Sequence, residues 1–421
     1  MNNAITRLFV AAFLLFTSIL AAQVQYEIAP PYNIKTVSFR RSGENVYPYF
    51  RLGEGFQFEF DDLYGNEANY YYSLQHCNYD WTPSSQLTIN DYLQGFDSQR
   101  IQEYRNSFNT LQIYSRYMLA FPNKFTSIKL SGNYVLKILN EDREVVFSRR
   151  FIVYEDQVSV PLQVKRARGA DVLQEKHNMD FSIKTNAFIF QNPLQNIKVV
   201  LFQNGRFDNA VYNVKPQYTI GNDLIYKYDK ETQFWAGNEY LYFENKDVRN
   251  AVNNVLRISA GEIYSTILYT NQARANVPYT FYPDVNGNFI TRNINPSVEN
   301  PHLESDYTWV YFSLSAPAFF EKKDIYVGGM FNNYAKTDEY KMEYNEKTSM
   351  YEKAIMIKQG FNNFMYITAD KKGVVDGKNA VDGNFYQTEN DYNIFVYYRE
   401  NNQRYDRVIG RGSANSENII N

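Results

Sequence analysis

The residues best suited to nucleophilic chemistry are His76 and Cys77, which are neighbours in the sequence. A cysteine and a histidine act as nucleophile and base only when their side chains meet in space. Successive residues of a strand point to opposite faces, so this pair cannot easily form a dyad. We therefore expect a buried structural role for Cys77, the only cysteine of the chain, and a core position for the nearby Trp81.

The remaining candidates for metal binding are two histidines and two acidic turns. His177 and His302 stand alone in the sequence, and a single cysteine excludes Cys-rich zinc sites. Residues 284–288 (Asp-Val-Asn-Gly-Asn) begin like a calcium loop, but the glycine is fourth instead of sixth, which favours a hairpin turn. The acidic turn at residues 61–67 could bind calcium loosely, and a solvated hairpin is the favoured interpretation. No catalytic residue, cofactor-binding residue or metal ligand is predicted.

Motifs of the common enzyme classes are missing from the sequence. It contains no glycine-rich phosphate loop, no Gly-x-Ser-x-Gly and no His-Glu-x-x-His. The 46 acidic residues could supply a carboxylate pair for glycoside hydrolysis, but the sequence fixes no distance between them. The chain is therefore predicted not to be an enzyme, and a hydrolase with an unrecognised carboxylate site is the remaining catalytic alternative.

The N-terminal residues predict export. Residues 1–22 combine one positive charge with an apolar run and a small-residue junction, which is the pattern of a secretory signal peptide. The apolar run, residues 8–20, is shorter than the roughly 20 residues that a transmembrane helix needs, so no direct membrane insertion is expected. A formal net charge of −3 offers neither a basic face for nucleic acid nor a polybasic patch for anionic lipid.

Alternation of apolar and polar residues dominates the rest of the chain and predicts an all-β fold. In residues 56–60, three phenylalanines fall on one face of a strand and polar groups on the other. The 38 tyrosines and 31 phenylalanines suit half-buried sheet surfaces and interfaces. Further strands are predicted around residues 134–138, 145–153, 181–183, 197–201, 224–228, 325–327, 351–357, 364–367 and 393–397.

The predicted architecture is a series of tandem β-sandwich domains, immunoglobulin-like or early-set-like, after the signal peptide. Turn-rich and proline-containing segments divide the chain. The expected parts are an N-terminal β-sandwich at 23–156, a middle β domain at 157–304, a C-terminal early-set-like sandwich at 305–410 and a flexible tail at 411–421.

The C-terminal part resembles the glycogen-binding, early-set type of β-sandwich. The similarity lies in Gly-Gly-Met-Phe-Asn-Asn-Tyr at 328–334 and in the glycine turn with aromatics at 360–366. In such modules exposed rings stack on sugar faces, and here Tyr334 stands where a tryptophan is expected. The resemblance implies the fold, and it leaves a carbohydrate-binding envelope protein as the alternative function, because a fold does not fix a site.

A second resemblance covers nearly all of the chain after residue 22. Residues 70–81 read Tyr-Tyr-Tyr-Ser-Leu-Gln-His-Cys-Asn-Tyr-Asp-Trp, and the pattern continues through segments 34–40, 51–54, 58–63, 91–97, 107–110, 132–134, 149–155, 203–206, 237–239 and 406–410. Together these segments resemble the plug protein family of the type IX secretion system of Bacteroidetes.

The resemblance implies a periplasmic, non-enzymatic subunit whose partner is the outer-membrane translocon β-barrel. Such a protein docks on the periplasmic end of the barrel and occludes its pore. The long connection at residues 88–110 is the expected contact surface, because long ordered loops are usually functional. Deletion of residues 92–105 is the corresponding test.

Overall fold

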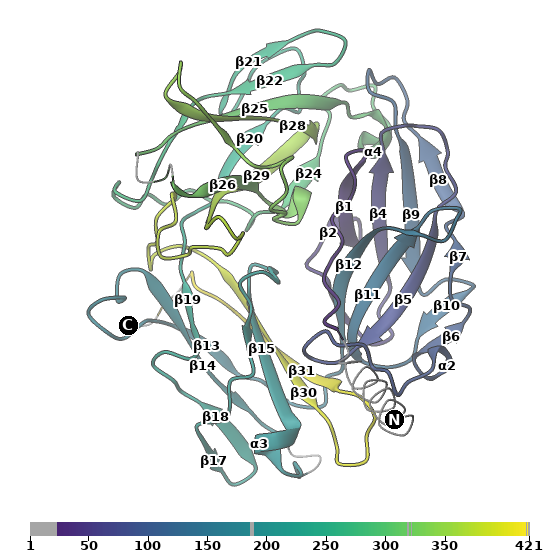
Figure 1. Cartoon of the computed structure of the whole chain (residues 1–421), viewed down its shortest axis with the longest axis vertical. Coiled ribbons are helices and arrows are strands. Elements are labelled where there is room, and N and C mark those ends of the chain that lie inside the picture. Colours follow the sequence, from purple (N-terminus) through teal and green to yellow (C-terminus); the bar gives the residue numbers. More distant parts are fainter. Residues whose placement is uncertain (1–22, 186–188, 318–319, 321, 418, 420–421) are drawn as a thin grey trace, which may run out of the picture.

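The structure, a computed structural model, describes residues 23–185, 189–317, 320, 322–417 and 419. The predicted signal peptide lies outside these residues. Strands dominate, and the α-helices α2 (Ile89–Tyr92), α3 (Pro193–Asn196) and α4 (Pro301–Glu304) are single turns (Figure 1). The all-β prediction is confirmed. No helix in the described part of the chain is long and apolar enough to cross a membrane.

The first β-sandwich stands at the right of Figure 1. One sheet has the order β2-β1-β4-β9-β8, the other β3-β12-β11-β5-β7, and β10 pairs with β6 beside them. The strands are β1 (Ile34–Arg41), β2 (Glu44–Asn45), β3 (Tyr49–Arg51), β4 (Phe56–Asp62), β5 (Tyr71–Cys77), β6 (Leu93–Gly95), β7 (Gln99–Arg100), β8 (Glu103–Asn106), β9 (Ser115–Phe121), β10 (Thr126–Ile128), β11 (Gly132–Leu139) and β12 (Val145–Tyr154).

Phenylalanine rings fill the core between these two sheets. Phe56, Phe58 and Phe60 of β4 are buried while Gln57 is exposed, as the alternating pattern predicts. The rings of Phe50 and Phe56 stack across the sandwich with centroids 3.8 Å apart. Aromatic pairs of this kind add stabilisation beyond the area that they bury.

The middle sandwich combines strands from two distant parts of the sequence. Its sheets have the orders β13-β14-β18-β17, with β19 also on β14, and β16-β15-β30-β31. The strands are β13 (Leu162–Arg166), β14 (Lys176–Ile183), β15 (Ile197–Gln203), β16 (Val211–Tyr212), β17 (Tyr218–Ile220), β18 (Asp223–Tyr226), β19 (Gln233–Trp235), β30 (Asp391–Tyr398) and β31 (Arg407–Asn415). One apolar core joins both sheets.

The third sandwich is formed by the residues between β19 and β30. Its sheets have the orders β20-β29-β24, with β26 also on β29, and β21-β22-β25-β28-β27, with β23 on β25. The strands are β20 (Leu241–Glu244), β21 (Val255–Ser259), β22 (Ser265–Leu268), β23 (Asn271–Gln272), β24 (Phe289–Thr291), β25 (Tyr307–Ser315), β26 (Asp324–Gly328), β27 (Glu343–Asn345), β28 (Met350–Lys358) and β29 (Gly360–Ala369), with a 3-10 turn, η2 (Met330–Asn332).

The third sandwich is therefore inserted in the middle one, which differs from the expected contiguous parts at 157–304 and 305–410. β20 and β24 precede residue 304, yet both pair with β29 of the third sandwich. β30 follows residue 305, yet it pairs with β15 of the middle sandwich over seven residues. Apolar alternation reveals strands but not their partners, so this nesting could not be read from the pattern.

The expected flexible tail also differs from the structure. Residues 411–415 continue β31, which pairs with β30 as far as Asn415. Gly410 and Gly412 leave room for Val158 and Val160, since a Cβ at either glycine would lie within 3 Å of these valines. A polar, glycine-containing sequence can thus form a strand where a close neighbour requires small residues.

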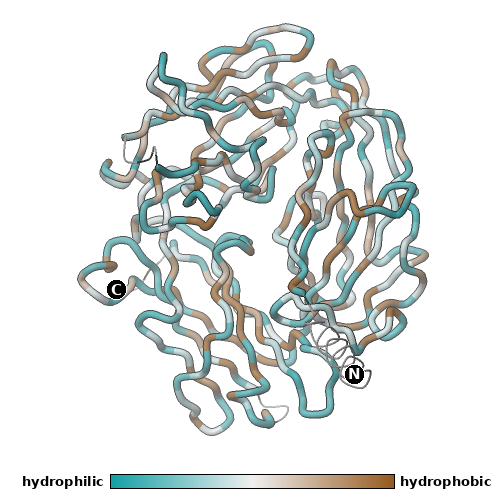
Figure 2. Tube along the Cα trace, in the orientation of Figure 1, coloured by the Kyte–Doolittle hydropathy of each residue, from teal (hydrophilic) through white to brown (hydrophobic). Residues whose placement is uncertain are grey.

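The first sandwich lies against both of the others. One contact packs β3, β5, β11 and β12 on β15, β30 and β31, with the rings of Tyr49 and Phe395 4.8 Å apart. The hydroxyl of Tyr397 donates a 2.7 Å hydrogen bond to Asn133 in the same contact. A smaller cluster joins the first sandwich to the third through residues that include Tyr114 and Tyr307. Hydrophobic segments follow the strands inside the sandwiches, whereas many connecting loops are hydrophilic (Figure 2).

Candidate functional site

His76 and Cys77 lie in β5 and face different surroundings. The ring of His76 contacts Ser84 Oγ at 2.8 Å and the Ser131 carbonyl at 3.1 Å. Cys77 is buried in the contact with the middle sandwich, and Trp81 lies in the same cluster. Burial lowers the pKa of His76 to about 4 and raises the pKa of Cys77 to about 12, so both are neutral at pH 7. This arrangement activates neither group.

The two other histidines are each bound to neighbouring side chains or carbonyls. His177 contacts the Tyr392 hydroxyl and the Tyr386 carbonyl, each at 2.7 Å. His302 accepts a 2.9 Å hydrogen bond from the guanidinium of Arg40. Burial lowers the pKa of His177 to about 4, and burial with nearby positive charges lowers the pKa of His302 to about 3. Both therefore act as neutral hydrogen-bonding groups.

The turn at 284–288 has the backbone that its sequence predicts, but the hairpin prediction is wrong. Asn286 and Gly287 have φ values of 52° and 84°, in the left-handed region. The strand after this turn, β24, pairs with β29 and not with a strand before the turn. The turn instead brings Asp284 to a small group of carboxyl side chains.

This group contains Glu239, Asp284 and Glu389. Glu239 accepts hydrogen bonds from the Glu389 amide at 3.1 Å and from the Tyr279 hydroxyl. Burial is the main cause that raises the pKa of Glu239 to about 7 and that of Asp284 to about 6. Among the described residues, no set of three or more His, Cys, Asp or Glu side chains is arranged to hold a metal ion. Glu239 and Asp284 can therefore hold protons near neutral pH.

The solvated hairpin predicted at residues 61–67 is wrong for its first two residues. Asp61 and Asp62 belong to β4, and their exposed fractions are 0% and 1%. Asp62 accepts hydrogen bonds from Asn33 at 2.8 Å and from Tyr70 at 2.9 Å. The polar sequence around these carboxylates predicts exposure to solvent. They are buried because they bind hydrogen-bond donors that are distant in the sequence or lie beyond the turn.

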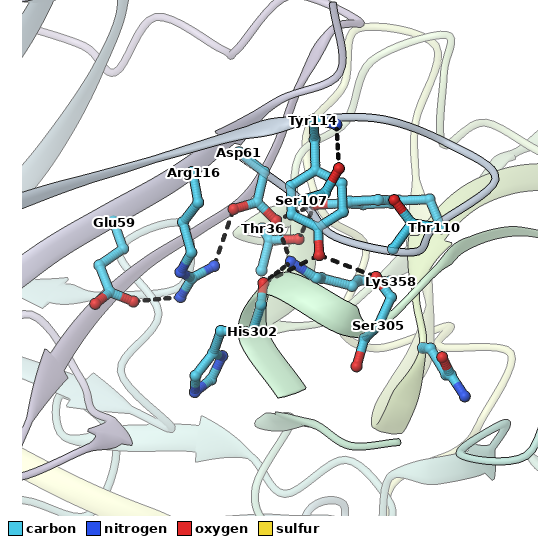
Figure 3. A network of polar contacts seen from close by, with 12 residues as sticks. Thr36, Glu59, Asp61, Ser107, Thr110, Tyr114, Arg116, His302, Ser305 and Lys358 are labelled. Atoms are coloured by element: carbon cyan, nitrogen blue, oxygen red, sulfur yellow. Dashed lines mark hydrogen bonds and ion pairs between the residues drawn. The ribbon is translucent and has the colours of Figure 1, made fainter. Parts of the chain in front are cut away.

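Asp61 is the centre of a buried polar network between the first and third sandwiches (Figure 3). Its carboxylate receives Arg116 at 2.9 Å on one oxygen. The other oxygen receives Lys358 at 2.6 Å and the Tyr307 hydroxyl at 2.7 Å. Arg116 comes from β9 beside Asp61, whereas Lys358 ends β28 and Tyr307 begins β25. A single carboxylate thus joins two strands of each sandwich.

Further contacts surround this centre on both sides. The Lys358 amine also donates to the His302 carbonyl at 2.7 Å and lies 3.9 Å from the centre of the Tyr114 ring. The Tyr114 hydroxyl donates to the Ser305 carbonyl at 3.0 Å. We call the following set the clamp network: Thr36, Glu59, Asp61, Tyr114, Arg116, His302, Tyr307 and Lys358.

The charges of the clamp network stabilise one another away from water. Burial alone would raise the pKa of Asp61, but Lys358 and Arg116 outweigh it and hold this pKa below its usual range. Burial lowers the pKa of Lys358 to about 7 against the attraction of Asp61. Burial also raises the pKa of Tyr307 well above its ordinary value. Since Asp61 is ionised and 2.6 Å away, the protonated amine is the form that fits this contact.

A lysine with a lowered pKa is a common catalytic group, but this one has no access to a substrate. The side chains of Lys358 and Asp61 are 3% and 0% exposed. The arrangement can fix the relative position of two sandwiches, and breaking it would leave a buried charge unpaired. Sequence reasoning missed Lys358, Tyr307 and Arg116, because their pairing with Asp61 spans up to 297 positions.

An exposed apolar surface lies beside the clamp network. The connection from β8 to β9 closes on itself, since Ser107 and Tyr114 exchange hydrogen bonds through their amides. Residues 107–114 contain no charged side chain. Four apolar residues of this connection and the adjoining turn are exposed, and we call them the docking loop: Tyr64 (65% exposed), Phe108 (70%), Leu111 (50%) and Ile113 (57%).

The expected contact surface at residues 88–110 is more structured than a loop. It contains α2, β6, β7 and β8, and Tyr92 and Leu93 are buried in the core of the first sandwich. Deletion of residues 92–105 would therefore damage the fold and would not isolate a surface. Phe96 and Phe108 are the exposed rings of this stretch, at 69% and 70%.

Tyr334, the expected sugar-stacking residue, is buried. Its exposed fraction is 5%, and its hydroxyl lies 3.0 Å from that of Tyr240. The guanidinium of Arg206 lies 4.7 Å from the centre of the Tyr334 ring. This ring is therefore not an open platform for a sugar.

The comparisons with known proteins agree with this architecture. A crystal structure of a hypothetical protein from Parabacteroides merdae ATCC 43184 is similar with a TM-score of 0.87 and 32% sequence identity, over 93% of this chain and 100% of that chain. No curated protein matches the chain. Residues 34–155, which form the first sandwich, match the family described as type 9 secretion system plug protein 1st domain. That family is a component of a secretion machinery of the cell envelope, associated with an outer-membrane component, and is not a known enzyme family. By residues 34–155, the first sandwich belongs to the type IX secretion system plug protein family, as the first domain of such a protein.

Proposed function

We propose that this protein is a periplasmic plug, which docks on the periplasmic end of the outer-membrane translocon barrel and occludes its pore. The observation that carries the proposal is the family match of the first sandwich together with the exposed, uncharged docking loop on that sandwich. A wide barrel filled with water passes solutes unless something fills its opening. A plug needs bulk, rigidity and an anchoring surface.

Rigidity is supplied by the two contacts of the first sandwich. An aromatic cluster holds it to the middle sandwich, and the clamp network holds it to the third. Domains joined by small polar interfaces move relative to one another, whereas large apolar interfaces and buried ion pairs resist such motion. The three sandwiches therefore offer a single block to the pore.

The docking loop is the proposed anchor on the barrel. Its four apolar side chains are 50–70% exposed. Ile113 lies against Gly65, the neighbour of Tyr64, and Gln112 donates to the Leu63 carbonyl, so the connection and the turn lie side by side. Exposed aromatic and aliphatic clusters without charge are typical of interface centres. The connection is also fixed to α4, because the Phe108 amide donates to the Leu303 carbonyl.

The test is affinity purification of the tagged protein from detergent-solubilised outer membranes, with the eluted proteins identified. We expect the wild-type protein to bring down a very large barrel protein. The double variant Phe108→Asp and Ile113→Asp should lose it, since burying two charges at an interface centre costs at least about 2 kcal/mol each. Phe96→Asp is the matched control, because Phe96 is equally exposed but lies near β6 and β10, away from the docking loop.

Two results would contradict the proposal. Equal recovery of the barrel with the Phe108→Asp, Ile113→Asp variant would show that the docking loop is not the anchor. Recovery of the wild-type chain alone, in cells where the barrel is abundant, would contradict docking itself. Occlusion is tested separately by comparing the entry of a large outer-membrane-excluded dye into cells with and without the protein, and entry should rise in its absence.

A further inference from the structure

Residues 24–30 run along an edge of β12 that the neighbouring strand leaves open. β3 pairs with β12 only over residues 152–154. Beside the uncovered part, the Ser148 amide donates to the Ile28 carbonyl at 3.0 Å, and the Ile28 amide donates to Ser148 Oγ at 2.9 Å. An open sheet edge is a ready template for an added strand, and here the chain's own N-terminal segment occupies it.

The segment is held mainly by polar contacts, and of its apolar side chains Val24 packs against the cluster between the first and middle sandwiches. Tyr26 and Ile28 are 72% and 46% exposed. The Glu27 carboxylate accepts from the Arg150 amide at 2.7 Å, where a strand carbonyl would stand in a regular ladder, and from Asn333 of the third sandwich at 2.6 Å. Segments with few buried apolar contacts open at low free-energy cost.

The N-terminal segment leaves the hydrogen-bonding capacity of Arg149 partly unused. Its side chain is 9% exposed, and its Nε lies 3.5 Å from the Glu27 carboxylate and makes no hydrogen bond within the described residues. A buried guanidinium gains most from a carboxylate that meets it at hydrogen-bonding distance. The site therefore favours a carboxylate placed closer than that of Glu27.

The segment borders a cavity lined by apolar and aromatic side chains. The cavity measures about 720 Å³ and lies where the three sandwiches meet. Aromatic side chains line it, among them Trp81 and Phe207, and the guanidinium of Arg150 lies 4.4 Å from the centre of the Trp81 ring. Such walls accept apolar side chains on either side of a bound carboxylate.

We propose that this edge and cavity form a binding site for an extended peptide strand of a partner protein, one with a carboxylate between apolar side chains. Residues 24–30 fill the site as an intramolecular ligand that such a strand displaces. The strand adds to β12 through its backbone, its carboxylate pairs with Arg149, and its apolar side chains enter the cavity. The site shares no residue with the docking loop, so it does not depend on how the protein binds the barrel.

The test measures binding of a fluorescent peptide, Gln-Val-Gln-Tyr-Glu-Ile-Ala-Pro, to the mature full-length protein by anisotropy. Glu27→Ala weakens the resident segment, so this variant should bind the peptide at least about tenfold more tightly than the wild type does. Replacing the peptide's Glu by Gln should weaken its binding to the Glu27→Ala protein about tenfold, because a charge-assisted contact is lost. This second change is in the peptide, so folding of the protein is not affected.

Equal binding of the two peptides would overturn the role of the carboxylate and the proposal with it. Equal or undetectable binding by the wild-type and Glu27→Ala proteins would show that residues 24–30 do not compete for the site, and would also overturn it. A variant with Arg149→Met added to Glu27→Ala should lose the preference for the Glu peptide over the Gln peptide.

Discussion

Replacing Lys358 by Met tests whether the clamp network holds the first and third sandwiches together. Methionine keeps most of the apolar length of the side chain but removes the amine that lies 2.6 Å from Asp61 and 2.7 Å from the His302 carbonyl. Breaking a buried ion pair costs about 3–5 kcal/mol, because the remaining charge stays buried. Asp61 keeps Arg116 and the Tyr307 hydroxyl, so we expect a loss near the lower end, about 3 kcal/mol.

The matched control is Lys353→Met on the same strand. Lys353 lies 3.7 Å from Glu343, whose side chain is 84% exposed, so its loss should cost about 1 kcal/mol or less. The assay is urea unfolding followed by tryptophan fluorescence; Trp309, one of the three tryptophans, lies in β25 beside the interface. A free energy of unfolding for Lys358→Met that equals that of Lys353→Met would refute the assignment of a stabilising role to the network.

A double-mutant cycle separates the pair from its surroundings. Asp61→Asn alone leaves Lys358 without its carboxylate, and Lys358→Met alone leaves Asp61 without its amine. The double variant removes both charges, so its loss should be smaller than the sum of the two single losses by about 1 kcal/mol or more. Additive losses would mean that the two groups act independently.

Three further predictions concern protonation and topology. His76 and His177 have folded pKa values lowered from 6.5 to about 4. Their contribution to the free energy of unfolding is therefore complete above pH 6.5 and is lost as the pH falls towards 4, by about 3 kcal/mol each. Urea unfolding at pH 7 and pH 4.5 should show the decrease, and a flat profile would contradict it. Glu239 has a raised folded pKa of about 7, so its contribution to stability is complete below pH 4.5 and is lost as the pH rises through 7. Glu239→Gln should flatten this part of the plot of melting temperature against pH, and an unchanged slope would exclude Glu239 as its cause. Removal of residues 407–421 takes away β31 and with it Val408, which shares a buried cluster with Trp81. Tryptophan emission should therefore shift to the red, and unchanged emission would mean that the cluster closes without that strand.

The strands and the core could be predicted from the sequence, because burial of one sheet face imposes a two-residue period. Phe56, Phe58 and Phe60 show this directly, and each predicted strand overlaps an observed one. Strand partners could not be predicted, since the pairing of β15 with β30 joins residues about 200 positions apart and leaves no local trace. The family resemblance to plug proteins is confirmed over residues 34–155.

The clamp network could not be predicted from the sequence for a related reason. Asp61 and Asp62 precede a glycine-containing turn, and two adjacent carboxylates there predict solvent. Their burial depends on Arg116, Lys358 and Tyr70, and only the tertiary fold brings these side chains together. The exposed rings of the docking loop are equally invisible in the sequence, where Phe108 resembles any other aromatic residue of a strand-rich chain.

The insertion of the third sandwich in the middle one determines the order in which the three sandwiches can be completed during synthesis. As the chain emerges from its N-terminus, the first sandwich has all of its strands once residue 154 is free, and the third once residue 369 is free. β13 to β19 are made earlier than any strand of the third sandwich, yet their facing sheet stays incomplete until β30 and β31 arrive. During that interval β15 pairs only with β16 and its other edge waits for β30, so this open edge is the place for which a holding chaperone would compete. The last 31 residues of the chain therefore complete a sheet begun more than 190 residues earlier. A polypeptide released before they are made would have complete first and third sandwiches and an incomplete middle one.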